Sequence, residues 1–131
     1  MRHLWTILCV DRYEGILTTL PPVLQQLGYR VLTASSARDA VAGAKAAHPD
    51  VVLLDFHLCP GCPENPNRPC LARDLKDVAP QARIVVWCDD GTSMRHPPPC
   101  AVATFMKPIP PAELDARLQA LNEPQAKRLQ S

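Results

Sequence analysis

The sequence lacks the signals that direct a chain into or across a membrane. No apolar run approaches the roughly 20 residues needed to span a bilayer. The segment Met1–Trp5 leads directly into a strand-like run, without the apolar core and small-residue cleavage site of a signal peptide. The formal net charge is only +1, which gives no reason to expect a nucleic-acid or acidic-membrane partner. We therefore expect a cytoplasmic protein, in which the six cysteines are thiols or metal ligands rather than structural disulfides.

The motifs of a self-sufficient enzyme are also missing. The chain has only five glycines, and none forms a loop that would cradle a phosphate. No nucleophile–base pair is evident either, so we do not expect an independent enzyme, beyond accepting a phosphoryl group and losing it again. With 131 residues, 47% of them hydrophobic and 21% charged, the chain fits one globular domain. We place this domain at residues 1–122 and a polar tail at residues 123–131.

What the sequence does contain is an alternation of strand-like and helix-like segments. The run Val51–Leu54 is wholly apolar and ends abruptly at Asp55, which is typical of a parallel strand buried on both faces. Alternation of this kind predicts an α/β fold with a doubly wound, five-stranded parallel sheet. The expected strands are 5–10, 29–34, 51–55, 83–87 and 101–106, and the expected helices are 16–27, 37–47, 70–78 and a last one from 111.

Prolines and caps refine two of these helices. Pro21 and Pro22 lie inside the first helical pattern, so we expect a kinked helix or one that begins near Leu20 with Thr18 or Thr19 as its cap. Gly28 stands where this helix should stop. For the second helix, Ser35 or Ser36 is the expected cap. Between the fourth and fifth strands, Pro97–Pro99 forbids a regular helix, so the fourth helix of the alternation should be degenerate.

Three charged residues follow strand ends and form an ordered set. Asp11 follows the first strand, Asp55 ends the third, and Lys107 follows the fifth and precedes Pro108. Because parallel strands end at one edge of the sheet, we expect these residues to share one site. A lone aspartate at a strand end would suggest only a cap or a turn, but the set of three argues against that interpretation.

These residues resemble the motif of the receiver domain of bacterial two-component response regulators, and Leu27–Val31 and Thr33–Ala37 resemble that family around its second strand. The resemblance covers Trp5 to Leu121 and implies a flavodoxin-like, stand-alone receiver whose output is a protein contact. It implies that Asp55 accepts a phosphoryl group in a phosphorelay and that Lys107 contacts that group, in a lysine–proline pair that is typically cis. Asp11, Asp55 and the backbone carbonyl of His57 would hold Mg²⁺. The implied partners are a histidine kinase or phosphotransfer protein and a downstream protein target, and the oligomeric state is left open.

The sequence departs from the family pattern beside Asp11. The family has a second acid there, which is the direct metal ligand, whereas this chain has Arg12. A guanidinium supplies only positive charge and hydrogen-bond donors, so Mg²⁺ binding should be weak. Either Arg12 pairs with Asp55 and stands in for the metal, or it points into solvent. Glu14 could reach back toward the site, although its position is not the family's ligand position.

Two further departures affect signal output. Cys88 occupies the position at which the family places a Thr or Ser that contacts the phosphoryl group, and a thiol is a weak donor. At the position of the family's aromatic switch residue stands Thr104, with Phe105 beside it. We therefore expect weak coupling between phosphorylation and a conformational change.

A cysteine group follows Asp55 closely. Cys59 and Cys62 have the Cys-x-x-Cys spacing that suits Zn²⁺ or a redox pair, and Cys70 or His57 could complete a set. A second such pair, which zinc modules normally show, is missing, so unliganded loop cysteines are an equal alternative. The sequence thus leaves three functions open: a divergent receiver with a weak Mg²⁺ site, a pseudo-receiver that binds partners without phosphorylation, and a cysteine-based redox or metal sensor on a receiver scaffold.

Overall fold

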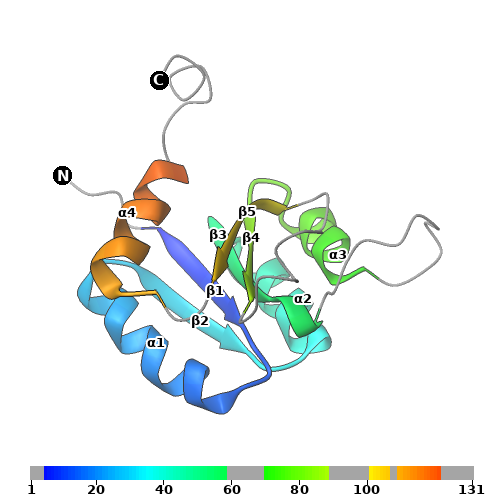
Figure 1. Cartoon of the computed structure of the whole chain (residues 1–131). Helices are drawn as coiled ribbons and strands as arrows, with labels where there is room; N and C mark the ends of the chain where they lie inside the picture. The colour runs from blue at the N-terminus through cyan, green and yellow to red at the C-terminus, as the bar shows by residue number, and fades with distance from the viewer. Residues whose placement is uncertain (1–4, 59–69, 89–100, 107–108, 122–131) are drawn as a thin grey trace.

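A five-stranded parallel sheet forms the centre of the protein (Figure 1). The computed structural model describes residues 5–58, 70–88, 101–106 and 109–121. The strand order is β2-β1-β3-β4-β5. Strand β2 therefore lies on one side of β1, and β3, β4 and β5 follow on its other side, so the strand order reverses between β1 and β3. This confirms the predicted doubly wound, flavodoxin-like α/β class. The strands are β1 (Thr6–Val10), β2 (Arg30–Ala34), β3 (Val51–Asp55), β4 (Arg83–Cys88) and β5 (Ala101–Met106).

Helices cover both faces of this sheet (Figure 1). Helices α1 (Glu14–Gln26) and α4 (Pro111–Leu121) pack on one face through Leu24, Leu114 and Leu118. Helices α2 (Ala37–Ala47) and α3 (Leu71–Val78) pack on the other, and a short 3₁₀ turn, η1 (Phe56–Leu58), follows β3. Within the described ranges, none of the helices has the length and apolar character needed to cross a membrane.

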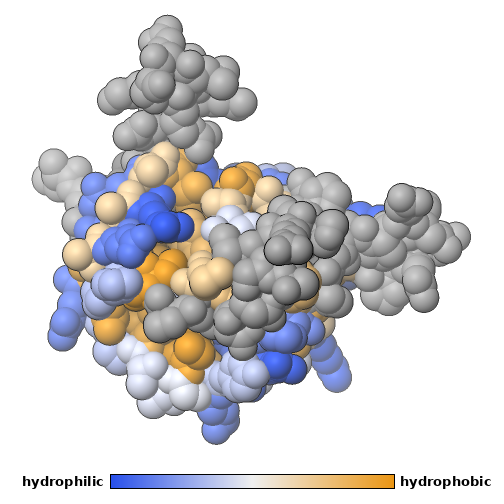
Figure 2. Space-filling model, in the orientation of Figure 1, coloured by the Kyte–Doolittle hydropathy of each residue, from blue (hydrophilic) through white to orange (hydrophobic). Residues whose placement is uncertain are grey.

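Some apolar surface remains uncovered. Figure 2 shows apolar residues, in orange, reaching the surface in the middle of the face in view, with polar residues, in blue, around them. Among the described residues, the exposed large hydrophobic side chains are Tyr13, Leu32, Val102 and Met106. Val102 and Met106 belong to the edge strand β5, whereas Tyr13 lies beside the carboxyl end of β1.

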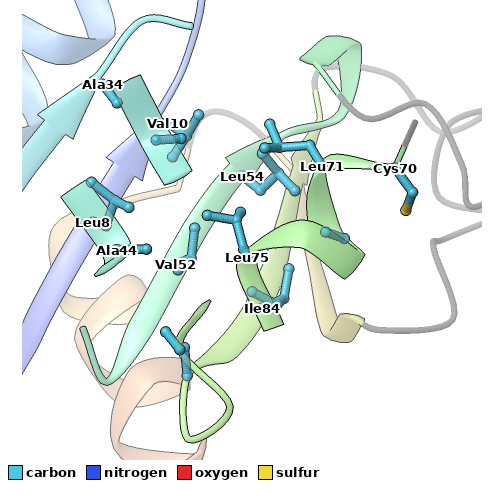
Figure 3. Packing of buried hydrophobic residues seen from close by; sticks show 14 residues of the cluster. Leu8, Val10, Ala34, Ala44, Val52, Leu54, Cys70, Leu71, Leu75 and Ile84 are labelled. Carbon is cyan, nitrogen blue, oxygen red and sulfur yellow. The ribbon is translucent and has the colours of Figure 1, made fainter. Parts of the chain in front are cut away.

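The core has two halves because strand side chains alternate between the faces of the sheet. Val52 and Leu54 of β3 point toward α2 and α3, where Figure 3 shows them close to Leu71 and Leu75. The alternate residue Leu53 belongs to the half beneath α1 and α4. All five residues of β3 are buried, as the apolar run predicted. Each fully buried side chain of this size contributes about 1.5–3 kcal/mol, so β3 is fixed firmly in the middle of the sheet.

The start of α2 and the end of α1 lie where capping residues in the sequence predicted them. Of the two candidate caps of α2, the structure uses Ser36, whose side chain accepts a hydrogen bond from the backbone N–H of Asp39 at 3.2 Å. Gly28 follows α1 with a φ of 101°, a conformation that a residue with a Cβ rarely adopts. Gly28 therefore marks the end of α1 before β2, and Ser36 marks the start of α2 after β2.

Of the two alternatives for α1, the late start near Leu20 is wrong. The helix begins at Glu14 and runs through Pro21 and Pro22 to Gln26. Thr18 and Thr19 do not cap it. Their hydroxyls instead donate to the carbonyls of the preceding turn, at Glu14 and Gly15. The helix persists because its apolar face packs on the sheet: Leu24 is fully buried, and Leu17, Leu20 and Leu27 are partly buried beside it. Tertiary packing therefore outweighs the backbone hydrogen bonds that the prolines remove.

Several predictions concern residues outside the described ranges. These are the degenerate fourth helix within residues 89–100, the polar tail at 123–131, the Lys107–Pro108 pair, and the loop that holds Cys59 and Cys62. The remaining helices agree with their expected positions. Helix α4 in particular buries Leu114, Leu118 and Leu121, the three residues predicted to share its inner face.

Candidate functional site

The carboxyl ends of β1 and β3 bring two acids together. Asp55 is the last residue of β3, and Asp11 directly follows Val10, which pairs with Leu54 of β3. The two carboxylates therefore lie at neighbouring positions of the sheet edge, at the point where the strand order reverses. Open α/β sheets place their ligands at such a point. Both residues are buried: Asp11 is 2% exposed and Asp55 is 0% exposed.

Hydrogen-bond donors from both neighbouring segments surround the Asp55 carboxylate. The backbone N–H of His57 donates to Oδ1 at 3.1 Å, and the backbone N–H of Arg12 approaches Oδ2 at 3.4 Å. The guanidinium of Arg12 forms an ion pair with the same oxygen, with Nε and Oδ2 3.8 Å apart. A buried carboxylate is costly unless donors and countercharge compensate it, and these three contacts provide both.

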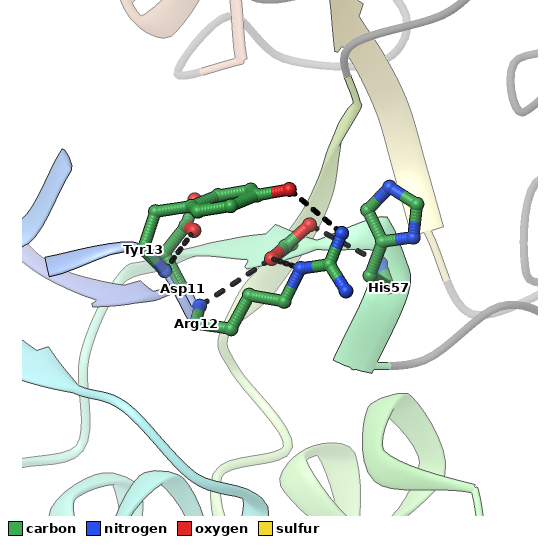
Figure 4. A network of polar contacts seen from close by, with 5 residues as sticks. Asp11, Arg12, Tyr13 and His57 are labelled. Atoms are coloured by element: carbon green, nitrogen blue, oxygen red, sulfur yellow. Dashed lines mark hydrogen bonds and ion pairs between the residues drawn. The ribbon is translucent and has the colours of Figure 1, made fainter. Parts of the chain in front are cut away.

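Tyr13 holds the Arg12 guanidinium in this position. A terminal nitrogen of Arg12 donates to the Tyr13 hydroxyl at 2.8 Å, and the guanidinium carbon lies 4.8 Å from the centre of the tyrosine ring. Figure 4 shows the Arg12 guanidinium beside the Tyr13 hydroxyl, to which a dashed line joins it. Of the two alternatives left open by the sequence, the structure therefore has Arg12 paired with Asp55. Glu14 occupies the first turn of α1 and is exposed.

Asp11 shapes the backbone beside this pair. Its Oδ1 accepts a hydrogen bond from the backbone N–H of Tyr13 at 2.9 Å, a turn that aspartate commonly forms with the residue two positions on. Its own N–H donates to the carbonyl of Ala34 at the end of β2, at 3.1 Å. Asp11 thereby directs the chain so that Arg12 faces Asp55. This is a positioning role in addition to any charge it supplies.

The donor set fits Mg²⁺ poorly. Mg²⁺ requires oxygen ligands in near-octahedral geometry, as Asp11, Asp55 and the His57 carbonyl would provide in part. At the position of the family's second acid, however, Arg12 brings a positive charge to within 3.8 Å of Oδ2 of Asp55. The described residues contain no group of three or more His, Cys, Asp or Glu side chains arranged to hold a metal ion. The weak Mg²⁺ site predicted from the sequence thus has an arginine where a ligand should be.

The end of β4 carries Cys88, the residue at the family's Thr/Ser position. Cys88 is completely buried, and its Sγ donates toward the backbone carbonyl of Phe105 on β5 at 3.7 Å. Phe105 is itself buried, whereas Thr104 is half-buried. The weak thiol donor is thus directed at the neighbouring strand. The weak coupling expected at this position stays a prediction.

Cys9 is a buried residue of β1, two positions before Asp11 in the chain. Burial, and secondarily the nearby Asp11 charge, raise the pKa of Cys9 from 9.0 to about 12. The thiol is therefore protonated at neutral pH and acts as a small apolar core residue, as the sequence suggested.

Other candidates are only partly placed. Cys70 is buried directly before α3, while Cys59 and Cys62 lie outside the described residues, as does Lys107. Strand β5 ends at Met106, the residue before Lys107, and Met106 pairs with Cys88 at the same edge of the sheet as Asp55. Tyr13 was missed by sequence reasoning. The available signal was an aromatic residue directly beside the unusual arginine.

Comparisons with known proteins agree with this geometry. The chain matches no protein-family model. A stretch of 52 residues is 42% identical to the alkaline phosphatase synthesis transcriptional regulatory protein PhoP of Bacillus subtilis (strain 168). This stretch makes up 40% of the chain but only 22% of that relative, so the chain is similar to a minor part of it.

Solved structures resemble the chain over nearly its whole length. The BeF₃-activated DrrB receiver domain is 26% identical, with a TM-score of 0.64, and the match covers 92% of this chain and 100% of that one. The receiver domain of a sensor histidine kinase from Pseudomonas aeruginosa PAO1, solved with magnesium in its active-site cleft, is 22% identical, with a TM-score of 0.70 and coverage of 90% and 97%. A response regulator receiver domain from Clostridium thermocellum is 24% identical, with a TM-score of 0.68 and coverage of 98% and 100%. From its sheet order, from the acids at its strand ends and from these likenesses, the chain has the fold of response-regulator receiver domains and is similar to them.

Proposed function

We propose that this receiver domain accepts a phosphoryl group on Asp55 and passes the signal on through a protein contact. The observation that carries the proposal is the position of Asp55. It ends the central strand β3, at the sheet edge between β1 and β3 where the strand order reverses, and both of its carboxylate oxygens face hydrogen-bond donors. A carboxylate oxygen can attack phosphorus, provided that nearby cations stabilise the charge on the transferred group. Arg12 supplies one such charge, and Lys107 is the proposed second.

The chemical step is a transfer between two proteins. An Asp55 oxygen forms a bond to phosphorus while the bond from phosphorus to a histidine nitrogen of the donor breaks, and that nitrogen is reprotonated from water. The proposed donor is a histidine kinase or a phosphotransfer protein, and the proposed receiver of the signal is a further protein. The setting would be the bacterial cytoplasm. The net charge of +1 gives no reason to include a nucleic acid or a membrane.

A second candidate is a pseudo-receiver that binds its partner without phosphorylation. The ion pair between Arg12 and Asp55 favours it, because the central carboxylate already has a positive charge beside it at rest. In this case Arg12 would hold the domain in one state permanently, and no phosphodonor would modify Asp55.

The cysteine sensor remains a separate proposal. It would need Cys59 and Cys62 to act with Cys70, which the structure buries directly before α3. Thiol titration and metal analysis of the purified protein test this directly. Full reactivity of the loop thiols, together with the absence of bound metal, would rule out a sensor of this kind.

The phosphoacceptor proposal is tested by intact-mass spectrometry after incubation with acetyl phosphate and Mg²⁺. The wild-type protein should gain one phosphoryl group, and Asp55→Asn should gain none. Asp50→Asn is a matched control, since Asp50 directly precedes β3 at its other end and accepts a hydrogen bond from the Thr6 N–H at 2.8 Å, which asparagine can also accept. This control should be modified like the wild type. An unmodified wild-type protein, or equal modification of Asp55→Asn, would contradict the proposal.

A further inference from the structure

We infer that the Arg12 guanidinium, positioned by Tyr13, replaces the divalent cation of this site, so that Asp55 accepts a phosphoryl group without Mg²⁺. This inference rests on the proposed function and adds to it the identity of the charge that makes transfer possible. It starts from the disagreement between the family's metal site and the donor set present in this chain.

The charges around Asp55 favour a cation that belongs to the chain itself. Phosphoryl transfer to Asp55 places additional negative charge at an edge that already holds Asp11 and Asp55, both almost fully buried. Such charge needs a cation close by. With Arg12 in place of an acid, the site carries one negative charge fewer and one positive charge more than the family pattern. The site therefore has part of the required charge without a metal, and repels a divalent cation more than the family's site would.

The position of the guanidinium is the second step. Its Nε lies 3.8 Å from Oδ2 of Asp55, and the backbone N–H of the same residue approaches that oxygen at 3.4 Å. A phosphoryl group on Asp55 would thus be formed next to the guanidinium. The planar fork of arginine matches two phosphate oxygens at once, which a lysine cannot do. The Arg12 side chain is also 44% exposed, so the core does not enclose the side of the guanidinium at which a group attached to Asp55 would arrive.

Tyr13 supplies the third step because it fixes the arginine beforehand. The Tyr13 hydroxyl accepts a hydrogen bond from Arg12 at 2.8 Å, and its ring lies under the guanidinium at 4.8 Å. The tyrosine is 45% exposed, so the hydrophobic core does not explain its position. A guanidinium held in place loses little rotamer freedom when a phosphoryl group arrives. We therefore assign Tyr13 as a positioning residue that acts through Arg12.

With acetyl phosphate as donor, the step balances without a metal or a proton. An Asp55 oxygen forms a bond to phosphorus, the bond between phosphorus and the acetate oxygen breaks, and acetate leaves with the electron pair. The Arg12 guanidinium would hold the oxygens of the phosphoryl group during this exchange.

The experiment compares initial rates of adduct formation from acetyl phosphate in EDTA and in millimolar Mg²⁺, followed by intact mass. The wild-type rates should agree within about twofold, whereas Arg12→Asp, which introduces an acid at this position, should need Mg²⁺ and be at least about tenfold faster with it. Arg12→Lys should remain independent of Mg²⁺ but react more slowly, because it keeps the charge and loses the fork. Unfolding curves of each variant establish that it is folded.

The variant Tyr13→Phe distinguishes a residue that positions Arg12 from one that only stabilises the fold. It should slow the wild-type reaction in EDTA, yet leave the Mg²⁺-supported reaction of Arg12→Asp unchanged, because no guanidinium is then left to position. Equal slowing in both backgrounds would refute the positioning role of Tyr13.

The outcomes separate this inference from the proposed function. A wild-type reaction that occurs only with Mg²⁺ would overturn the role of Arg12 while leaving Asp55 as phosphoacceptor. Saturable binding of Mg²⁺ to the wild type at submillimolar concentration, measured by calorimetry, would also overturn it. Absence of an adduct on the wild type in both EDTA and Mg²⁺ would refute the proposed function itself.

Discussion

The contact between Arg12 and Asp55 should be measurable as a coupling free energy. Two unit charges 3.8 Å apart attract by about 4 kcal/mol at an effective dielectric constant of about 20. The guanidinium is 44% exposed, however, and solvent screens much of this attraction, whereas the Asp55 carboxylate is fully buried. We therefore expect the pair to contribute about 1–2 kcal/mol to the free energy of unfolding, between the values typical of surface pairs and buried pairs.

A double-mutant cycle measures this coupling. Urea unfolding would be compared for the wild type, Arg12→Ala, Asp55→Asn and the double variant. Arg12→Ala should destabilise the wild type by about 1–2 kcal/mol and have little effect in the Asp55→Asn background, where no charge is left to compensate. A coupling smaller than about 0.3 kcal/mol would refute the view that Arg12 neutralises Asp55.

Three further predictions concern the scaffold around the site. Pro22→Ala should raise the free energy of unfolding by about 1–2 kcal/mol, because Pro22 is exposed in the interior of α1 and lacks an N–H; an unchanged or lower urea midpoint would contradict this. Tyr29→Phe should cost about 1 kcal/mol in the same assay, since the Tyr29 hydroxyl donates to Asp115 Oδ1 at 2.9 Å and ties the start of β2 to α4, and no loss would mean that this bond is not formed in solution. The pKa of Cys9 is about 12 in the folded protein, against 9.0 for an ordinary thiol. Its contribution to the free energy of unfolding should therefore be complete below pH 9 and fall by up to about 1.4 kcal/mol per pH unit as the pH rises from 9 toward 12. Unfolding free energies of the wild type and Cys9→Ala across this range test the last prediction, because only the wild type should show this part of the decline.

Much of the architecture could be predicted because the responsible signals are local. The apolar run before Asp55 is buried in full as β3, Ser36 caps α2, and the inner face of α4 is the one that the leucine spacing indicated. The start of α1 could not be predicted in this way. The prolines left a kinked helix or a start near Leu20 open, whereas packing of Leu24 and its neighbours against the sheet accompanies a helix that begins at Glu14.

The sequence predicted that the two acids of the site lie close together, but it did not predict the orientation of Arg12. Asp11 and Asp55 follow strand ends, and the register of a parallel sheet then brings them together. The direction of the Arg12 side chain depends on the turn that Asp11 makes with the Tyr13 N–H and on the tyrosine ring that receives the guanidinium. Such three-dimensional contacts leave no periodic pattern in the sequence. For that reason the sequence left two orientations of Arg12 open.

The central claim is that Asp55 forms an acyl phosphate, and chemical trapping of the modified residue tests it most directly. The protein would be treated with acetyl phosphate and then with borohydride, which reduces an aspartyl phosphate to homoserine, and peptides would be sequenced by tandem mass spectrometry. We expect homoserine at position 55 in the wild type and no homoserine in Asp55→Asn. Homoserine at another aspartate, or none in the wild type, would contradict it.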